Sequence, residues 1–279
     1  MEKEYQHIIP QGYLKAWCPP DPPPGRAGQV WVVQKANPED KVLRSPKNHF
    51  GRENQYTVTT NGTRDLSVEN ALAKVENTFS HVMSRLKQQH PLRPKDRVYL
   101  SFFAAAMFAR VEPFTNTVAN MLRTAQAQAE RLARKHGTSN ELSQEIGESL
   151  KNVVGDTVSI GVIENQKMLE RMSLTILTVD DDAGFITSDA PGCLCIPGPA
   201  SIGLHPFLGH EDVEATLPLS PRHLAIYTWM AKQVRYKLGT RRLVDEINSR
   251  IMSRCVKEFV SWKGIVRAEW FVNSQTPSD

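Results

Sequence analysis

The pattern of hydrophobic and polar positions predicts short strands near the start of the chain. Gln29 to Lys35 (QVWVVQK) is rich in β-branched and aromatic residues, which favours a strand. Gln55 to Thr60 (QYTVTT) predicts a second strand, which an Asn–Gly pair ends. Residues 45–54 between them predict a connection with little regular structure. The five prolines within residues 18–28 predict a loop.

The middle of the chain changes to helical periodicity. Apolar residues spaced three and four apart predict a long helix over residues 65–87. Val98 to Phe114 is apolar on nearly all sides and predicts the central helix of the core, which Pro113 should kink or end. Thr115 to His136 predicts a more amphipathic helix, and residues 140–171 predict one or two more.

The last third of the chain mixes strands, a loop and a helix. Two apolar runs within residues 173–189 flank Asp180 to Asp182, which predicts a β-hairpin. Residues 190–215 are rich in proline and glycine and predict a covering loop. His223 to Trp229 predicts a further strand, and Leu243 to Trp262 predicts a closing amphipathic helix.

This order of elements predicts an α+β fold in which a helical block packs on a small, mostly antiparallel sheet. Regular alternation of strand and helix is absent, which argues against a parallel sheet. Strands from the N-terminal and C-terminal parts must then meet in one sheet, which brings the start of the chain close to residues 173–229. A hydrophobic content of 40% is ample for a core, and we expect residues 1–279 to form a single domain.

The composition limits which cellular compartment and which metal sites we expect for this protein. The chain has no apolar run of about 18 residues and no basic-then-apolar leader, which predicts a cytoplasmic protein without a membrane-spanning segment. Its four cysteines, at positions 18, 193, 195 and 255, include no C-x-x-C pair. We therefore expect reduced thiols, and structural zinc is disfavoured.

Charge alternates along the chain more strongly than the net charge of +4 suggests. Lys and Arg outnumber Asp and Glu by ten to three over residues 81–137 and by eleven to three over residues 222–267, whereas the ratio is three to ten over residues 138–189. The segments either neutralise one another across the fold or form a groove for nucleic acid or a phosphorylated ligand, whose phosphates would attract clustered Lys and Arg.

The mostly apolar opening stretch HIIPQGYLKAW contains three polar residues that are candidates for a site. His7, Gln11 and Tyr13 supply an imidazole, an amide and a phenol, which an irregular turn at Pro10 could point in one direction. A histidine that caps a local turn and a tyrosine that donates from the edge of the core would give the same pattern. Both interpretations stay open from the residues alone.

A second polar set lies within the helical block. Glu69 and Glu76 are seven residues apart, which places both on one face of the predicted helix beside an apolar stripe. Arg110 ends the apolar stretch of the next helix, where an unpaired guanidinium would be costly. A Glu–Arg pair is the obvious solution, and such a pair is either structural or part of a site.

Two further candidates lie in the last third. Asp189 ends a predicted strand in the turn TSDAP, where it could bind a metal, act as a base or cap its own turn. His205 follows in the loop. If His7, Glu69, Glu76, Asp189 and His205 converge, they furnish mixed nitrogen and oxygen ligands for a divalent metal, or the acid and base of hydrolysis. The common nucleotide-binding, zincin and serine-hydrolase motifs are absent.

An ordered set of stretches resembles a largely bacterial family known as domain of unknown function 4238. The stretches are HIIPQGYLKAW, VENALAKVE, FFAAAMFAR, FITSDAP, LPLSP and LVDEIN, which together span almost the whole chain. The resemblance implies that eight residues are the characteristic polar positions of the family: His7, Gln11, Tyr13, Glu69, Glu76, Arg110, Asp189 and Asn248. It implies one coherent domain and carries no reaction.

Two hypotheses for the function follow. The first is a hydrolase of nucleic acid or of a phosphorylated molecule. Asp189 and Glu76 would be bases or metal ligands, and His7 would be the acid–base group or a ligand. Arg110 would orient a carboxylate or bind a phosphate. Gln11, Tyr13 and Asn248 would then position the substrate, and a toxin or defence role is compatible with this activity. The second is a non-catalytic module that binds a polyanion or a protein, with the polar residues as a structural network.

Overall fold

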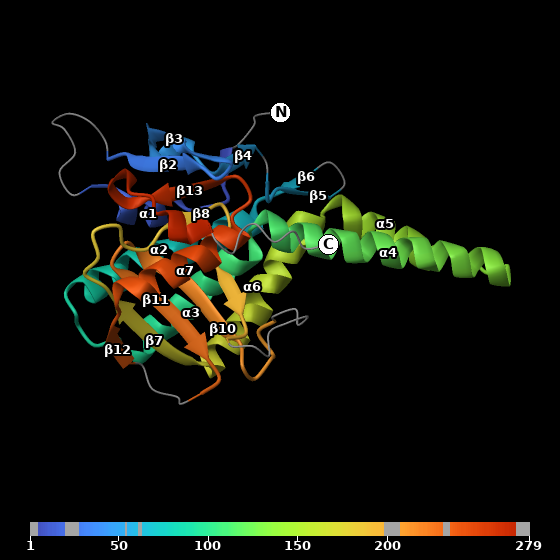
Figure 1. Ribbon diagram of the computed structural model, residues 1–279. Helices are drawn as coiled ribbons and strands as arrows, with labels where there is room; N and C mark the ends of the chain where they lie inside the picture. The colour runs from blue at the N-terminus through green and yellow to red at the C-terminus, as the bar shows by residue number, and fades with distance from the viewer. Residues whose placement is uncertain are drawn as a thin grey trace.

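A helical block and two larger sheets make up the fold, and a pair of helices projects from one side (Figure 1). The computed structural model describes residues 5–19, 28–53, 55–60, 63–197, 207–230 and 235–271. The expected α+β class is confirmed, with helices packed against sheets that are mostly antiparallel. No helix among the described residues is long and apolar enough to cross a membrane.

The helical block consists of three helices around a buried centre. They are α2 (Ser67–Lys87), α3 (Pro94–Ala109) and α6 (Val153–Arg171). Helix α3 packs against both α2 and α6, and its residues 103–109 are all buried, as its nearly uniform apolar sequence predicts. The prediction of a central helix is therefore confirmed.

Two helices form the projecting part, which is drawn in green and yellow-green in Figure 1. They are α4 (Glu112–His136) and α5 (Glu141–Lys151), which pack against each other. The predicted break near Pro113 is present, but helix α3 already ends at Ala109 and Pro113 lies in the first turn of α4. Proline is tolerated in a first turn because no backbone N–H is needed there.

The larger sheet has five strands in the order β12-β7-β11-β10-β9. All neighbours are antiparallel except β12, which runs parallel to β7. The strands are β7 (Ser173–Thr178), β9 (Cys193–Cys195), β10 (Glu214–Ser220), β11 (His223–Thr228) and β12 (Arg235–Leu238). The apolar side chains of the sheet join those of α3 in the main core. Strand β11 was predicted, whereas β9, β10 and β12 were not.

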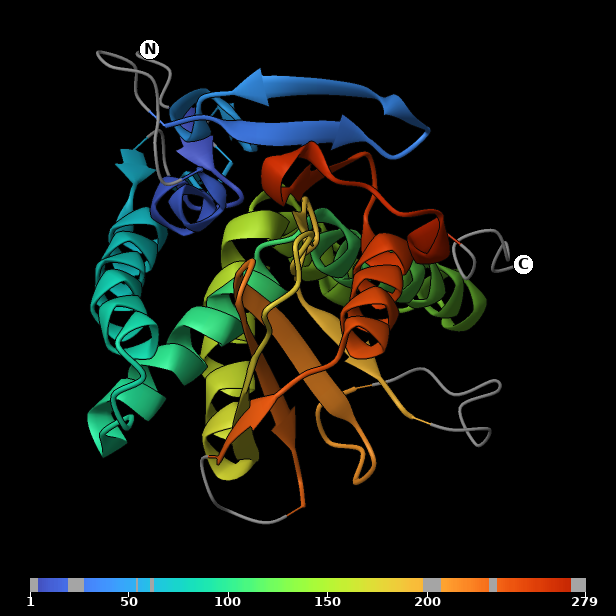
Figure 2. The ribbon, with the colours of Figure 1, turned by 60° about the vertical axis from the view of Figure 1, so that its left-hand side comes forward.

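The smaller sheet joins the two ends of the chain, as the sequence predicts. Its order is β3-β2-β13-β8, with β2 (Val30–Gln34), β3 (Asn37–Arg44), β8 (Thr187–Ser188) and β13 (Glu258–Ser261). Figure 2 shows the hairpin of β2 and β3 across the top of the molecule, above the red C-terminal segment. The single small sheet of the prediction is thus divided into two sheets.

The predicted hairpin within residues 173–189 is wrong. Strand β7 pairs with β11 and β12, whereas β8 pairs with β13 in the other sheet. The carboxylate of Asp181 accepts backbone N–H groups of Ala183 and Gly184, so the connection folds on itself and does not bring the two strands together. Gly184 has a φ of 62°, which a glycine adopts without strain.

The predicted closing helix is half wrong. Helix α7 (Arg241–Arg254) covers its first part, but residues 258–261 form strand β13. Phe259 and Val260 are buried between β2 and β8, and that pairing outweighs the helical periodicity. A further correction concerns residues 45–54, which were expected to be irregular and contain a short 3₁₀ helix over residues 46–48 and strand β4 (Gly51–Glu53).

Short elements complete the N-terminal part. Strand β1 (Tyr5–His7) pairs with β4, and β5 (Val58–Thr60) pairs with β6 (Thr63–Asp65). Helix α1 (Gln11–Leu14) continues into a 3₁₀ helix over residues 15–17. The predicted loops over residues 18–28 and 190–215 lie partly outside the described residues.

Candidate functional site

The opening motif is anchored on the segment before Asp189. The Tyr13 hydroxyl donates to the carbonyl oxygen of Pro218 at 2.7 Å, and the Thr187 hydroxyl lies 2.8 Å from it and serves as its donor. Trp17 Nε1 donates to the carbonyl oxygen of Phe185 at 2.8 Å. Burial raises the pKa of Tyr13, although its hydrogen bond with Thr187 opposes this shift. Tyr13 therefore ties the motif to β8 within the core.

Asp189 holds the turn between α7 and β13. Its carboxylate accepts the backbone N–H groups of Val256, Lys257 and Glu258 at 2.8, 2.7 and 3.2 Å. Its own N–H donates to the carbonyl oxygen of Glu258 at 3.1 Å. Three charge-assisted bonds to consecutive amides fix the chain direction at the point where the helix ends and the strand begins. The carboxylate thus caps a distant turn, whereas the sequence suggested only its own.

Asn248 is fully buried, whereas Gln11 is only half-buried. Asn248 lies in α7, where Oδ1 accepts the N–H of Ile186 and Nδ2 donates to the carbonyl oxygen of Gly184, both at 3.0 Å. It joins helix α7 to the segment that leads into β8. Gln11 is the first residue of α1 and is half-buried.

Four of the predicted site residues line one small cavity, which we call the Arg110 pocket. The cavity has a volume of about 80 Å³. It is lined by His7, Glu69, Glu76 and Arg110 together with Gln6, Tyr56, Leu72 and Ala73. His7 of the opening motif and the helix that carries both glutamates therefore line one cavity, whereas Asp189 lines another.

Arg110 is the most deeply buried charge in this pocket, with 1% of its surface exposed. Its Nη2 donates to Glu76 Oε1 at 2.8 Å, and its guanidinium lies 5.8 Å from the centre of the Tyr56 ring. Nε and Nη1 are buried and have no hydrogen-bond acceptor among the described residues. Burial raises the pKa of Tyr56, and the positive charge of Arg110 opposes this shift.

Gln6, which the sequence reasoning missed, organises the rest of the pocket. Its Nε2 donates to Glu69 Oε2 at 2.6 Å and to Thr57 Oγ1 at 3.0 Å, and its Oε1 accepts the N–H of Tyr56 at 2.6 Å. His7 Nε2 donates to the carbonyl oxygen of Lys47 at 2.9 Å. A polar residue next to His7 was the only signal in the sequence.

A larger hollow, which we call the His49 pocket, has a volume of about 270 Å³. Strands β1 and β4 contribute to it and so does the turn held by Asp189. Its polar lining includes His49, Arg52, Glu112, Asp189, Lys257 and Glu258. His49 Nε2 donates to Glu258 Oε2 at 2.8 Å, and Gln34 Nε2 donates to the other oxygen of Glu258 at 2.6 Å. Arg52 forms an ion pair with Glu112 at 2.5 Å.

The backbone beside His49 is strained. Phe50 has a φ of 53°, which is unfavourable for a bulky side chain. Its carbonyl oxygen accepts the N–H groups of both Ile8 and Ile9, at 2.7 and 3.1 Å, and these bonds hold the conformation. The ring of Phe50 meets the His49 ring edge to face at 4.4 Å. The opening motif thereby positions His49, although neither His49 nor Glu258 was predicted.

The proposed metal ligands are distributed over different places. Glu69 and Glu76 line the Arg110 pocket and Asp189 lines the His49 pocket, whereas His205 lies outside the described residues. Within the described part of the chain, no three His, Cys, Asp or Glu side chains are placed to hold one ion. A metal ligand role for these four residues stays a prediction.

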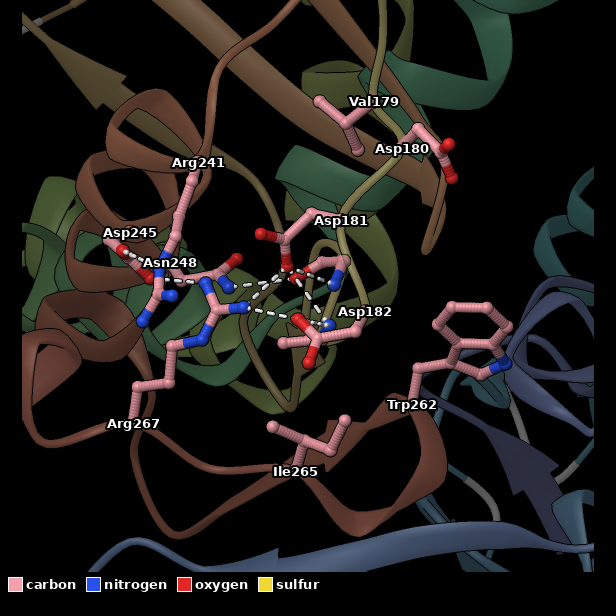
Figure 3. A network of polar contacts seen from close by, with 12 residues as sticks. Val179, Asp180, Asp181, Asp182, Arg241, Asp245, Asn248, Trp262, Ile265 and Arg267 are labelled. Carbon is pink, nitrogen blue, oxygen red and sulfur yellow. Dashed lines mark hydrogen bonds and ion pairs between the residues drawn. The ribbon is translucent and has the colours of Figure 1, made fainter.

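A separate network surrounds Arg267 and is drawn in Figure 3. Nη2 donates to Asp181 and Asp182 at 2.7 Å each, and Nη1 donates to Asp245 at 2.9 Å. Trp270 Nε1 also donates to Asp245 at 2.9 Å. Burial alone would raise the pKa of Asp181, but hydrogen bonds from Arg267 and from two backbone amides outweigh it and lower that pKa. The network fastens the C-terminal segment to the loop after β7.

Comparison with known proteins gives one match. The sequence model of a family described as "Protein of unknown function (DUF4238)" matches residues 5–263. No curated protein and no solved structure matches the chain.

Proposed function

The chain belongs to the DUF4238 family, and we propose that it is a hydrolase that releases phosphate from a phosphorylated molecule in the His49 pocket. The observation that carries this proposal is the pair of His49 and Glu258 in a hollow of about 270 Å³ beside Lys257. A histidine oriented by a carboxylate is the usual source of a general base near neutral pH.

The geometry supplies the parts of a simple displacement. Because Nε2 of His49 donates to Glu258, the lone pair resides on Nδ1, which makes no hydrogen bond to another described residue. Nδ1 takes a proton from water while the water oxygen attacks phosphorus. The bond from phosphorus to the leaving oxygen breaks, and that oxygen takes a proton from solvent. Glu258 stabilises the imidazolium and is itself held by Gln34.

Lys257 supplies positive charge for the phosphate oxygens. It is exposed at the rim and has no ion pair with a described residue, whereas Arg52 is already paired with Glu112. The hollow accommodates a phosphoryl group with a small substituent, and a longer substrate would extend from its open side. This arrangement supports a small phosphorylated molecule or the terminal phosphate of a nucleic acid as substrate.

The test is phosphate release by the purified protein and by His49→Gln. The substrates are a nucleotide, a sugar phosphate and an oligonucleotide with a 5′ phosphate. We expect His49→Gln to lower kcat by about 10²- to 10⁴-fold, the usual contribution of a general base. Lys257→Met should mainly raise KM, because it removes a charge that holds the substrate.

The matched control is His90→Gln, which changes an exposed histidine between α2 and α3 and should keep the full rate. Absence of phosphate release from all three substrates would overturn the proposal. An unchanged kcat in His49→Gln would do the same.

The Arg110 pocket favours a second candidate function, that of a binding module. A buried guanidinium with two unpaired nitrogens, which carry three N–H groups, is costly unless water or a ligand oxygen accepts from them. A cavity of about 80 Å³ has room for two or three waters at roughly 30 Å³ each. Glu76 already neutralises the single charge of Arg110, which disfavours a polyanion. The pocket suits a neutral amide, whose oxygen would accept from Arg110 and whose N–H would donate to a glutamate.

This second candidate is tested by the Nε–H resonance of Arg110 in nitrogen-15 NMR spectra, assigned with the variant Arg110→Lys. Titration with N-acetylglycinamide should shift this resonance, and inorganic phosphate should leave it unchanged. No shift with the amide would contradict the binding function. A shift with phosphate alone would assign the pocket to an anion.

A further inference from the structure

The projecting pair of helices has almost no interior of its own. We call residues 120–151 the arm; it contains most of α4 and all of α5 and extends away from the rest of the molecule in Figure 1. The buried residues of α4 are Thr115 and Ala119, which lie before the arm begins. Within the arm only Ser143 is buried. The two helices therefore gain little from burying each other.

Such a hairpin is marginal on its own. Helix α5 has 11 residues, whereas isolated helices shorter than about 12 to 15 residues are barely stable in water. The seam between the helices is formed on α4 by half-buried residues at helical spacing, Leu122, Gln126, Ala129 and Ala133. On α5 it is formed by Ser143, Ile146 and Leu150. This narrow contact leaves the arm in need of a further partner.

A second stripe runs along α4 beside this seam. Met121, Ala125, Gln128 and Leu132 follow the spacing i, i+4, i+7 and i+11, which places them on one face. All four are exposed; Met121 and Leu132 have 65% and 56% of their surface in solvent. Leu142 on α5 is also 61% exposed. The spacing is that of a helix face that packs on another helix.

The charges of the arm indicate which partner fits. Within the arm, α4 carries the exposed basic residues Arg131 and Lys135 beside the stripe, whereas Arg123 and Arg134 lie on the opposite side of the helix. Helix α5 carries exposed acidic residues, Glu141, Glu145 and Glu148. When two arms lie side by side and antiparallel, the basic helix of each faces the acidic helix of the other. The arm is thus complementary in charge to a copy of itself, which is the requirement of a two-fold interface.

We propose that the arm docks onto the arm of a second copy of this chain, so that the protein is a dimer held by a four-helix bundle. Met121, Leu132 and Leu142 form the apolar part of the interface, and the two opposite charge sets fix the antiparallel orientation.

The first test is the molar mass of the full-length chain in solution, measured by light scattering after size exclusion. We expect twice the chain mass of 31.4 kDa at about 100 µM, a concentration well above a Kd of about 1 µM. The double variant Met121→Glu, Leu132→Glu should have the mass of one chain and keep its circular dichroism. Met230→Glu is the matched control, because Met230 is exposed outside the arm, and it should stay dimeric.

The second test exchanges charges. One variant carries Arg131→Glu and Lys135→Glu on α4, and the other carries lysine at the three acidic positions of α5. Each variant alone has like charges on both helices and should be monomeric, whereas an equimolar mixture should form a mixed dimer. This recovery would not occur if the variants had merely unfolded.

Two outcomes overturn the proposal. One is a monomeric wild type at about 100 µM, the concentration of the first test. The other is a dimer that persists in both charge variants, because the interface then lies elsewhere. If a monomeric wild type binds single-stranded RNA, and the glutamate variant of α4 does not, the arm is a nucleic-acid surface.

Discussion

Two arginines with little exposed surface, Arg110 and Arg267, stand in opposite surroundings. Arg267 donates to three carboxylates, Asp181, Asp182 and Asp245, and lies at the centre of the network in Figure 3. Arg110 donates to the single carboxylate of Glu76 and leaves Nε and Nη1 without an acceptor among the described residues. Both side chains are removed from water, so the contrast lies in how completely their donors are used.

This contrast distinguishes the Arg267 network, which stabilises the fold, from the Arg110 pocket, which has space for another molecule. The Arg267 network joins segments far apart in sequence, and no unpartnered buried atom is found among its described members. The Arg110 pocket retains a cavity and unused donors. A polar cluster with complete hydrogen bonding stabilises a fold, whereas an incomplete one gains energy when a ligand completes it.

The largest effect is expected from Arg267→Met. The substitution leaves the largely buried Asp181 without a cation and leaves Asp245 with only the exposed Arg241, 3.8 Å away. It should therefore lower the free energy of unfolding by about 3 to 5 kcal/mol. Urea denaturation followed by circular dichroism measures the change. Asp180→Asn is the control, since Asp180 is an exposed partner of Arg222 and should change the stability little. If Arg267→Met lowers the free energy of unfolding no more than the control does, the network does not stabilise the fold.

Asp189→Asn should rank second. An asparagine oxygen accepts one or two of the three amide N–H groups without the negative charge, so the loss is about 1.5 to 3 kcal/mol. The same denaturation experiment measures it, with the exposed residue changed in Asp212→Asn as control. Unchanged stability together with lost phosphate release would instead assign Asp189 to contact with the substrate.

Acid should weaken the Arg267 network through Asp181. The pKa of Asp181 is lowered in the folded state, so its contribution is present above the ordinary pKa of 3.8 and is lost as the pH falls through the lower folded value. In Asp181→Asn this loss is absent. We therefore expect the melting temperature of the wild type to fall more steeply below pH 3.8 than that of the variant. Parallel curves in scanning calorimetry would contradict the coupling.

Arg110→Met should have the smallest effect. Glu76 keeps 29% of its side chain exposed and can be hydrated when its partner is gone, and the variant also removes two unpaired buried donors. We expect a loss of at most about 1 kcal/mol, because Glu76 can be hydrated and is not left as a buried charge without a partner, which is the case that costs several kcal/mol. A loss as large as that of Arg267→Met would show that Arg110 has a structural role equal to that of Arg267.

Local patterns predicted much of the fold. The helical spacing of α2 and the uniform apolar sequence of α3 are signals within one element, and both helices are confirmed. The errors arose where a residue far away in the sequence determines the local secondary structure. Residues 255–262 continue a helical pattern, but Asp189 binds the amides that begin β13, and it lies 67 to 69 residues earlier. Sequence periodicity contains no information about that carboxylate.

The same distinction applies to the sites. Glu76 and Arg110 could be paired from the sequence because a charge that ends an apolar helix needs a partner, and the structure confirms the pair. His49 and Glu258 are separated by 209 residues and lie in segments without a recognisable motif. Their pairing depends on β2 lying beside β13, which only the complete fold provides. The single domain expected over residues 1–279 stays a prediction.

The pairing of β2 with β13 also determines how the protein can be made. Gln34 and its partner Glu258 are 224 residues apart, and ribosomes add roughly 5 to 20 residues per second. One edge of β2 therefore waits about 10 to 45 s during synthesis for the strand that covers it. Throughout that interval the strand that contains Val30, Val32 and Val33 has one unpaired edge. Unpaired, apolar strand edges of this kind are sites to which chaperones bind in nascent chains.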